Sequence, residues 1–136
     1  MAKTTQQPDN LSYTETHEWV RVEGDQAYIG ISDYAQDELG DVVYLDLPWD
    51  EAGKRHVAAG AHFGDIESVK ATSELFSPVS GSIVRVNESL KDRAELVNSD
   101  PYGAGWMLVV QLSDPTELDH LMDATAYTKF IATAGH

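Results

Sequence analysis

The sequence predicts a mainly β domain with a few short helices, and two observations lead to this fold class. Short runs of aromatic and β-branched residues recur between turn residues, which is typical of strands. Gly40–Asp46 and Gly81–Asn87 repeat one pattern of Gly, apolar, Val, apolar and Asp/Asn, which suggests two similar halves packed face to face. The strand-like runs cover residues 11–22, 26–31, 42–47, 62–69, 75–86 and 106–112.

Three short helices are expected at the margins of this β domain. The first covers Tyr34–Leu39, with Ser32 or Asp33 as its N-cap. Pro115 begins the second, directly after an aspartate that can cap it, and the third begins near Asp123. We expect the last two to cover an end of the sheet rather than to bind a ligand. Loops are expected over residues 48–61 and 91–105.

The length of 136 residues suits one domain that can bury a core of its own. We expect residues 1–10 to be a disordered lead-in and residues 11–136 to form a single domain. The sequence has no cysteine, which agrees with a reducing compartment and excludes a thiol nucleophile or a thiolate metal site.

The charge of the chain narrows the classes of partner. Nine Lys+Arg against 23 Asp+Glu give a formal net charge of −14. This balance disfavours nucleic acids and anionic lipids and favours partner proteins with basic patches. No apolar run reaches the roughly 20 residues that cross a bilayer, and the first ten residues match neither a secretory signal nor a transit peptide.

Lys70 lies between two of the strand-like runs, in a short polar segment that would form a hairpin tip. A lysine there is solvated and points outward, which is the geometry that an enzyme needs to acylate one amine among several. The position alone also fits an ordinary turn residue, or an edge charge that discourages aggregation. The residues that separate these interpretations are its neighbours Glu67, Ser68, Val69 and Ala71.

Glu67–Ala71, followed by Ser77–Gly81, resembles the attachment hairpin of lipoyl-carrying domains. Val69 and Ala71 beside the lysine make it more similar to glycine cleavage H-proteins than to other carriers. Biotinyl domains usually have Met on both sides, and the lipoyl domains of 2-oxo acid dehydrogenases usually have Asp-Lys-Ala. The similarity runs in order over about residues 12–131. It includes residues 17–20, 30–36, 39–41, 47–48, 86–88, 96–103 and 105–106 and the helix around Tyr127.

Two features depart from the family pattern. The loop over residues 48–61 is a few residues longer than usual, and Ala94 stands where proline is common. Both lie away from the lysine hairpin, so they affect loop shape more than attachment.

The resemblance implies a flattened antiparallel sandwich, or barrel-sandwich hybrid, of the lipoyl/biotinyl type. It implies that Lys70 carries lipoate in amide linkage and that the protein is a non-catalytic carrier of the glycine cleavage system. The implied partners are a lipoate-attaching enzyme and three enzymes that the arm visits in turn. Glycine decarboxylase (P-protein) loads an aminomethyl group, aminomethyltransferase (T-protein) removes its carbon, and dihydrolipoamide dehydrogenase (L-protein) reoxidises the dihydrolipoyl arm.

The resemblance also implies a cleft in which the arm docks. Glu18 is the candidate to meet the amine of the loaded arm, because its segment matches the cleft side of the family. The alternative is that Glu18 is an ordinary exposed strand acid. His17 is the second candidate, and it fits equally well as a hydrogen-bonded structural histidine.

Other functions remain open or fit poorly. A lipoyl relay outside glycine cleavage fits the same residues, and a Schiff-base enzyme would need Lys70 buried with a depressed pKa. We expect no metal site, because the five histidines show no short paired spacing on a predicted helix. We expect a monomer in the cytoplasm of a bacterium, or in the mitochondrion if the source is eukaryotic. The sequence leaves the oligomeric state open.

Overall fold

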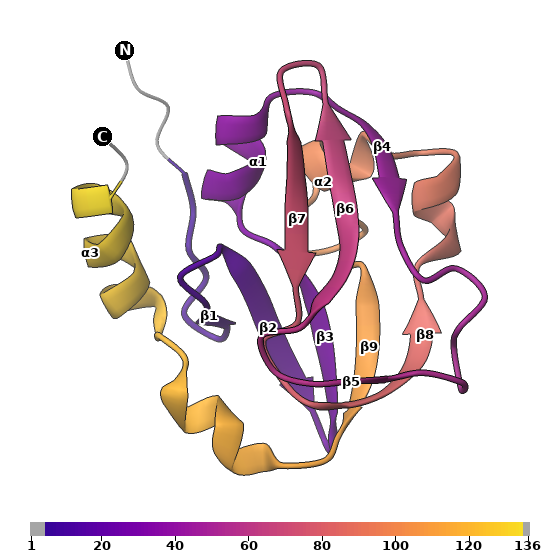
Figure 1. Ribbon diagram of the computed structural model, residues 1–136. Helices are drawn as coiled ribbons and strands as arrows, with labels where there is room; N and C mark the ends of the chain where they lie inside the picture. Colours follow the sequence, from indigo (N-terminus) through magenta and orange to yellow (C-terminus); the bar gives the residue numbers. More distant parts are fainter. Residues whose placement is uncertain (1–4, 135–136) are drawn as a thin grey trace.

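The computed structural model describes residues 5–134 and shows a mainly β protein with short helices (Figure 1). Within these residues the strands form two antiparallel sheets, in the orders β1-β2-β3-β9-β8-β5 and β4-β6-β7. This arrangement confirms the predicted fold class. The strands are β1 (Ser12–Tyr13), β2 (Glu18–Glu23), β3 (Gln26–Ile31), β4 (Val42–Asp46), β5 (His56–Val57), β6 (His62–Ser68), β7 (Thr72–Phe76), β8 (Gly81–Val86) and β9 (Leu108–Leu112).

The prediction of one strand over residues 11–22 is wrong, because the structure has two strands there. This segment is divided into β1 and β2 by a turn, in which the backbone N–H of His17 donates to the carbonyl of Thr14 over 3.1 Å. His17 takes a left-handed backbone conformation with φ 74°, which a regular strand does not contain. The turn folds β1 back on β2, with Tyr13 opposite Trp19. The next predicted strand, β3, agrees with the structure at both ends.

The run over residues 75–86 is also divided, and its two parts lie in different sheets. β7 pairs with β6, whereas β8 pairs with β9 and β5. The predicted loop over residues 48–61 contains β5, two residues that extend the six-stranded sheet beside β8. The two similar segments Gly40–Asp46 and Gly81–Asn87 supply β4 and β8, one strand to each sheet.

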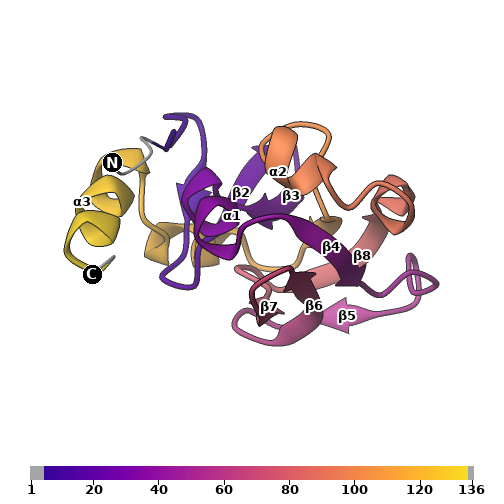
Figure 2. The ribbon, with the colours of Figure 1, turned by 90° about the horizontal axis from the view of Figure 1, so that it is seen from above.

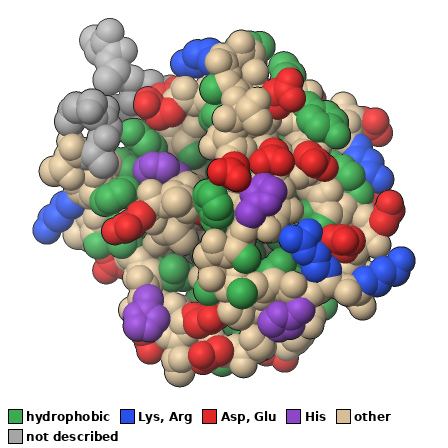
Figure 3. Space-filling model, viewed as in Figure 1, with side chains coloured by type: hydrophobic (Ala, Val, Ile, Leu, Met, Phe, Trp, Pro, Cys, Tyr) green, Lys and Arg blue, Asp and Glu red, His purple; other side chains and the backbone are tan. Residues whose placement is uncertain are grey.

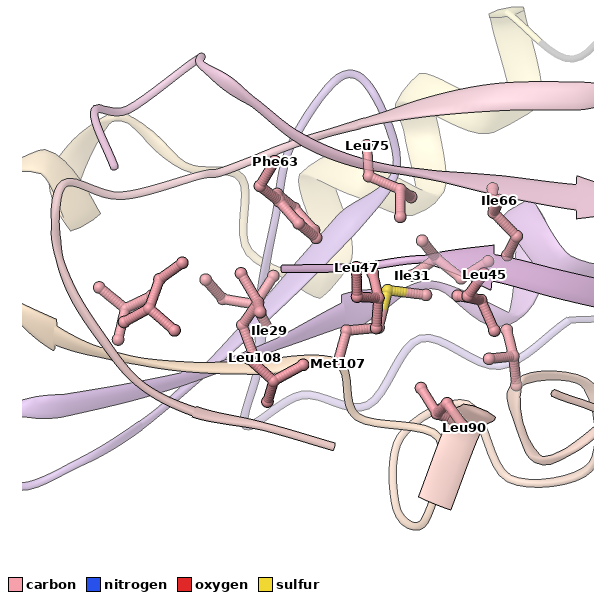
Figure 4. Packing of buried hydrophobic residues seen from close by; sticks show 14 of the residues in the cluster. Ile29, Ile31, Leu45, Leu47, Phe63, Ile66, Leu75, Leu90, Met107 and Leu108 are labelled. Atoms are coloured by element: carbon pink, nitrogen blue, oxygen red, sulfur yellow. The ribbon is translucent and has the colours of Figure 1, made fainter. Parts of the chain in front are cut away.

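The main core lies between the two sheets (Figure 4). Leu45, Ile66 and Leu75 of the small sheet face Ile29 and Leu108 of the large one, and all five side chains are almost completely buried. A second cluster lies under the C-terminal helix, where the rings of Tyr13 and Tyr127 stack with centroids 4.5 Å apart. Burial of this apolar surface is the main force that holds the sheets together.

The helices lie at the margins, as predicted, with two additions, α2 and η1. Ser32 caps α1 (Asp33–Leu39) by accepting from the N–H of Ala35, and Gly40 ends it at φ 79°. The predicted loop over residues 91–105 contains α2 (Leu96–Ser99), which packs against α1. The remaining helices are η1 (Glu88–Lys91), η2 (Pro115–His120), which is a 3₁₀-helix capped by Asp114, and α3 (Ala124–Ala134).

Two views place α3 at the side of the molecule away from β4 and β8 (Figure 2). Near it runs the expected lead-in, of which residues 1–4 lie outside the described residues. The N–H of Gln6 donates to Asp33 over 2.9 Å, and the carbonyl of Gln6 accepts from the hydroxyl of Tyr102 over 2.6 Å. Among residues 5–134, no helix has the length and apolar character that a membrane span requires.

Candidate functional site: the lysine hairpin and its groove

Lys70 lies in the turn that joins β6 to β7, as the sequence predicts. The turn is built around Ser68, whose backbone N–H donates to the carbonyl of Ala71 over 2.8 Å. The Ser68 hydroxyl accepts from the N–H groups of Lys70 and Ala71, both over 3.1 Å. Ser68 is buried, so these bonds fix the backbone that carries the lysine.

The hairpin tip is also attached to the rest of the protein. The N–H of Val69 donates to the carbonyl of Asp41 over 3.0 Å, which ties the turn to the connection between α1 and β4. The Val69 side chain itself is 66% exposed. Glu67 and Ala71 are exposed as well, and Glu67 lies opposite Thr72 in the hairpin ladder. The tip is therefore a rigid backbone with an open surface.

The Lys70 side chain is exposed and extends across Gly40 at the end of α1. A Cβ at Gly40 would lie 3.0 Å from Cε of Lys70, so a larger residue there would press on the lysine stem. Among the described residues, the Lys70 amine has no hydrogen bond or ion pair. The Schiff-base alternative required a buried lysine, and the structure does not place Lys70 in that setting.

A groove of about 260 Å³ lies between β7 and α1, since residues of both elements line it. Figure 1 shows these two elements side by side. The groove begins near the hairpin, since Ser73 of β7 and Leu39 of α1 both line it. Its polar lining residues are Thr16, His17, Glu18, Tyr34, Glu38, Ser73 and Glu74. The structure thus brings both predicted cleft residues, His17 and Glu18, into one groove with the strand that follows Lys70.

Glu18 is buried in the lining of this groove, with 1% of its surface exposed. This burial rules out the alternative of an ordinary exposed acid. One carboxylate oxygen accepts from the hydroxyls of Thr14 and Thr16, and the other accepts from the backbone N–H of Phe76 over 3.2 Å. Desolvation by burial raises the pKa of Glu18 above its usual value, although these hydrogen bonds act in the opposite direction.

His17 is a hydrogen-bonded residue, and it also lines the groove. Its Nδ1 lies 2.8 Å from the hydroxyl of Tyr127, which in turn lies 2.7 Å from the hydroxyl of Ser32. The same ring lines the groove beside Tyr34. Burial lowers the pKa of His17, which favours the neutral imidazole. A left-handed residue at a groove wall is a strained conformation of the kind that clusters at functional sites.

A second, larger hollow of about 600 Å³ lies on the other side of Glu18. Thr16 and Glu18 line both hollows, so the carboxylate stands between them. Neither this arrangement nor the pairing of Thr14 and Thr16 with Glu18 could be predicted from the sequence. Both threonines precede β2 in an irregular turn, and turn geometry of this kind carries no periodic pattern.

The sequence model of the family described as "Glycine cleavage H-protein" matches residues 11–134. The chain belongs to the glycine cleavage H-protein family. Members of this family are lipoyl-bearing carrier components of glycine cleavage and are not enzymes. This is the same family that the residues around Lys70 resemble.

Two relatives and one solved structure show how far the likeness to H-proteins extends. A glycine cleavage system H protein of Brevibacillus brevis is 55% identical over 91% of this chain and 96% of its own length. A probable H protein of Haloarcula marismortui is 52% identical over 88% and 92%. The crystal structure of an H protein from Mycobacterium marinum, 35% identical, superimposes with a TM-score of 0.79 over 95% of this chain and 99% of that one.

Proposed function

We propose that Lys70 carries lipoate in amide linkage and that residues 11–136 form a single lipoyl-carrier domain of the glycine cleavage system. The observation that supports this most strongly is an exposed amine, without an intramolecular partner among the described residues, on a hairpin fixed by Ser68. Glu67, Val69 and Ala71 form the surface that a lipoate-attaching enzyme recognises, and the buried Ser68 holds the backbone beneath it. The open tip gives such an enzyme access from several sides.

The residues at the tip fit acylation of this amine. A lysine amine in water titrates near about 10.4, so the attaching enzyme removes a proton before the nitrogen attacks an activated lipoyl carboxyl group. The new N–C bond removes the charge of the side chain. The stem already lies across Gly40, and this position directs a longer arm toward α1 and the groove. Ser73, the second residue of β7, already lines the groove, so the groove begins close to the hairpin tip.

The groove between α1 and β7 fits as the docking site of the lipoyl arm. When bound, lipoate supplies a disulfide that accepts the aminomethyl group of glycine and is later restored from the dithiol. Glu18 offers a buried carboxylate to the amine of that group, and Thr16 and Glu74 line the same space. Partial exclusion of water by the groove slows hydrolysis at the carbon between sulfur and nitrogen. His17 positions the wall through its bond to Tyr127.

The partners that we propose are glycine decarboxylase, aminomethyltransferase, dihydrolipoamide dehydrogenase and the lipoate-attaching enzyme. The acidic surface of the carrier favours basic faces on these proteins. We also propose a cytoplasmic location and a monomer. Bacterial relatives such as that of Brevibacillus brevis support the location.

Intact-mass analysis tests the attachment. The native protein is incubated with lipoate, ATP and a lipoate-attaching enzyme, and it should gain one lipoyl-sized increment. Lys70→Arg should gain none. Lys54→Arg is the matched control, because Lys54 is also exposed, and it should gain the full increment. An increment that persists in Lys70→Arg would overturn the assignment of Lys70.

The lifetime of the aminomethyl-loaded arm tests the docking site independently of the attachment. Lipoylated native protein and Glu18→Gln are loaded with glycine by the decarboxylase, and loss of the aminomethyl increment is followed by mass. The Gln variant should lose it faster, because a neutral amide attracts the cationic amine less than a carboxylate does. Glu15→Gln is the control, since Glu15 is exposed. Equal lifetimes in native protein and Glu18→Gln would show that Glu18 does not bind the amine of the loaded arm.

A further inference from the structure

The outer face of the three-stranded sheet carries a row of acidic side chains that the carrier function does not explain. Asp65 of β6 lies opposite Asp46 of β4 on one side and opposite Glu74 of β7 on the other. Figure 3, which views this face, shows acidic groups side by side with a histidine next to them. Like charges directly opposite each other destabilise a sheet, so the row has a cost that a bound cation would relieve.

A β-bulge adds His62 to this row. His62 and Asp65 are three residues apart, and in a regular strand their side chains would point to opposite faces. The register of β6 against β7 shifts between His62 and Gly64, and this extra residue turns His62 to the face of Asp65. Nε2 of His62 lies 2.9 Å from a carboxylate oxygen of Asp65. Bulges that redirect a side chain in this way are common beside functional sites.

Three different donor groups then converge. One ligand atom from each of His62, Asp65 and Glu74 lies within 4.8 Å of the others, although the side chains come from two strands. A basic side chain beside the cluster, Arg55, is already engaged, because it pairs with Glu51 over 3.0 Å and donates to the carbonyl of His62. A hollow of about 470 Å³, lined by Asp46, His62 and Asp65, borders the cluster and leaves room for coordinated water.

We propose that His62, Asp65 and Glu74 form a surface binding site for a borderline divalent metal ion such as Zn²⁺. One imidazole nitrogen and two carboxylate oxygens are the donor set that Zn²⁺ and its first-row neighbours accept, whereas Mg²⁺ and Ca²⁺ prefer oxygen alone. The carboxylate of Asp46 adds negative potential beside the site. The ion links β6 to β7, the two strands of the Lys70 hairpin.

The expectation that the chain has no metal site rested on histidine spacing along helices. That criterion could not detect this cluster, since a bulge and a strand pairing create it. Glu74 also lines the groove along β7, so the metal holds one side chain of the groove wall. The proposal does not depend on attachment of lipoate to Lys70, and either can fail without the other.

Calorimetric titration with ZnCl₂ tests the site on the full-length unlipoylated protein. The native protein should bind one Zn²⁺ tightly. His62→Gln and Asp65→Asn should each weaken binding by about tenfold or more, the loss that removal of even an outer-shell partner can cause. His56→Gln and Asp119→Asn remove an exposed histidine and an exposed carboxylate elsewhere, and they should bind as the native protein does.

Thermal unfolding and NMR complete the test. At one fixed concentration, added Zn²⁺ should raise the Tm of the native protein more than that of His62→Gln, because the ion stabilises the folded state in proportion to its affinity for the site. The Tm of each variant without metal shows whether it is folded. The ring resonances of His62 should shift on addition of Zn²⁺ while those of His56 stay in place. Equal Zn²⁺ affinity in native protein and His62→Gln, or no binding by the native protein, would overturn the proposal.

Discussion

Glu18 illustrates, at the scale of one residue, how burial couples stability to pH. Its pKa is raised above 4.5 by desolvation, so the folded state binds this proton more tightly than the unfolded state does. The stability that Glu18 contributes therefore falls as pH rises from about 4.5 through the raised pKa. A carboxylate that weakens the fold near neutral pH agrees with the role that we propose for Glu18, which is to bind the cationic amine of the loaded arm.

Glu18→Gln should reveal this coupling. The difference in free energy of unfolding, variant minus native, should shift in favour of the variant as pH increases through that window, because the amide does not ionise. Urea denaturation at a series of pH values measures it. Glu15→Gln, at an exposed position, should show a smaller shift over the same range. A difference that does not vary with pH would contradict the burial argument.

Tyr127 shows how one hydroxyl connects the C-terminal helix to the groove. It lies within hydrogen-bond distance of both His17 and Ser32, while its ring stacks on Tyr13. Tyr127→Phe keeps the stack and removes both hydrogen bonds. We expect a loss of about 1–2 kcal/mol in free energy of unfolding, since His17 and Ser32 both lose a hydrogen-bond partner. Tyr44→Phe, at a residue that is 54% exposed, should change stability little.

At the scale of elements, Asn98 joins α1, α2 and β4. Its Oδ1 accepts from the N–H of Val42 over 2.8 Å, and its Nδ2 donates to the carbonyl of Gly40 and to Oε1 of Gln36, both over 2.9 Å. This junction lies directly before and after Asp41, whose carbonyl holds the lysine turn. The support of the hairpin thus extends into a helix far away in the sequence.

Asn98→Ala should destabilise the protein by about 1–3 kcal/mol, because it leaves the Val42 N–H and the Gly40 carbonyl without their partner. Urea denaturation measures the change. Ser99→Ala, on the same helix at an exposed position, should stay close to the native value. Equal stability of the two variants would show that water replaces the amide and that the junction is not rigid.

The sequence predicted those elements whose information is local. The Ser32 cap, the Gly40 stop and the lysine hairpin each depend on a few adjacent residues, and the structure contains all three. The break at His17 escaped prediction because a histidine with positive φ is held by tertiary contacts rather than by propensity. The groove was predicted only through the family resemblance, since its wall combines β2, α1 and β7, and their contact follows from the packing of the two sheets.

At the scale of the whole molecule, the charge of −14 governs encounters. Figure 3 shows that acidic side chains are spread over the face that carries β6 and β7. The association rate with glycine decarboxylase should fall by about tenfold or more from low to high salt, because salt screens electrostatic steering. Surface plasmon resonance measures the rate, with sucrose of equal osmolality as the uncharged control. A rate that is independent of salt would rule out charge steering.

The proposed carrier cycle requires that one hairpin lysine bears the arm and that this arm accepts the aminomethyl group. The most direct measurement is the intact mass and peptide map of lipoylated protein after reaction with glycine and glycine decarboxylase. We predict an aminomethyl increment in addition to the lipoyl group, both confined to the peptide that contains Lys70. Loading without lipoate, or loading on a peptide that lacks Lys70, would contradict the account.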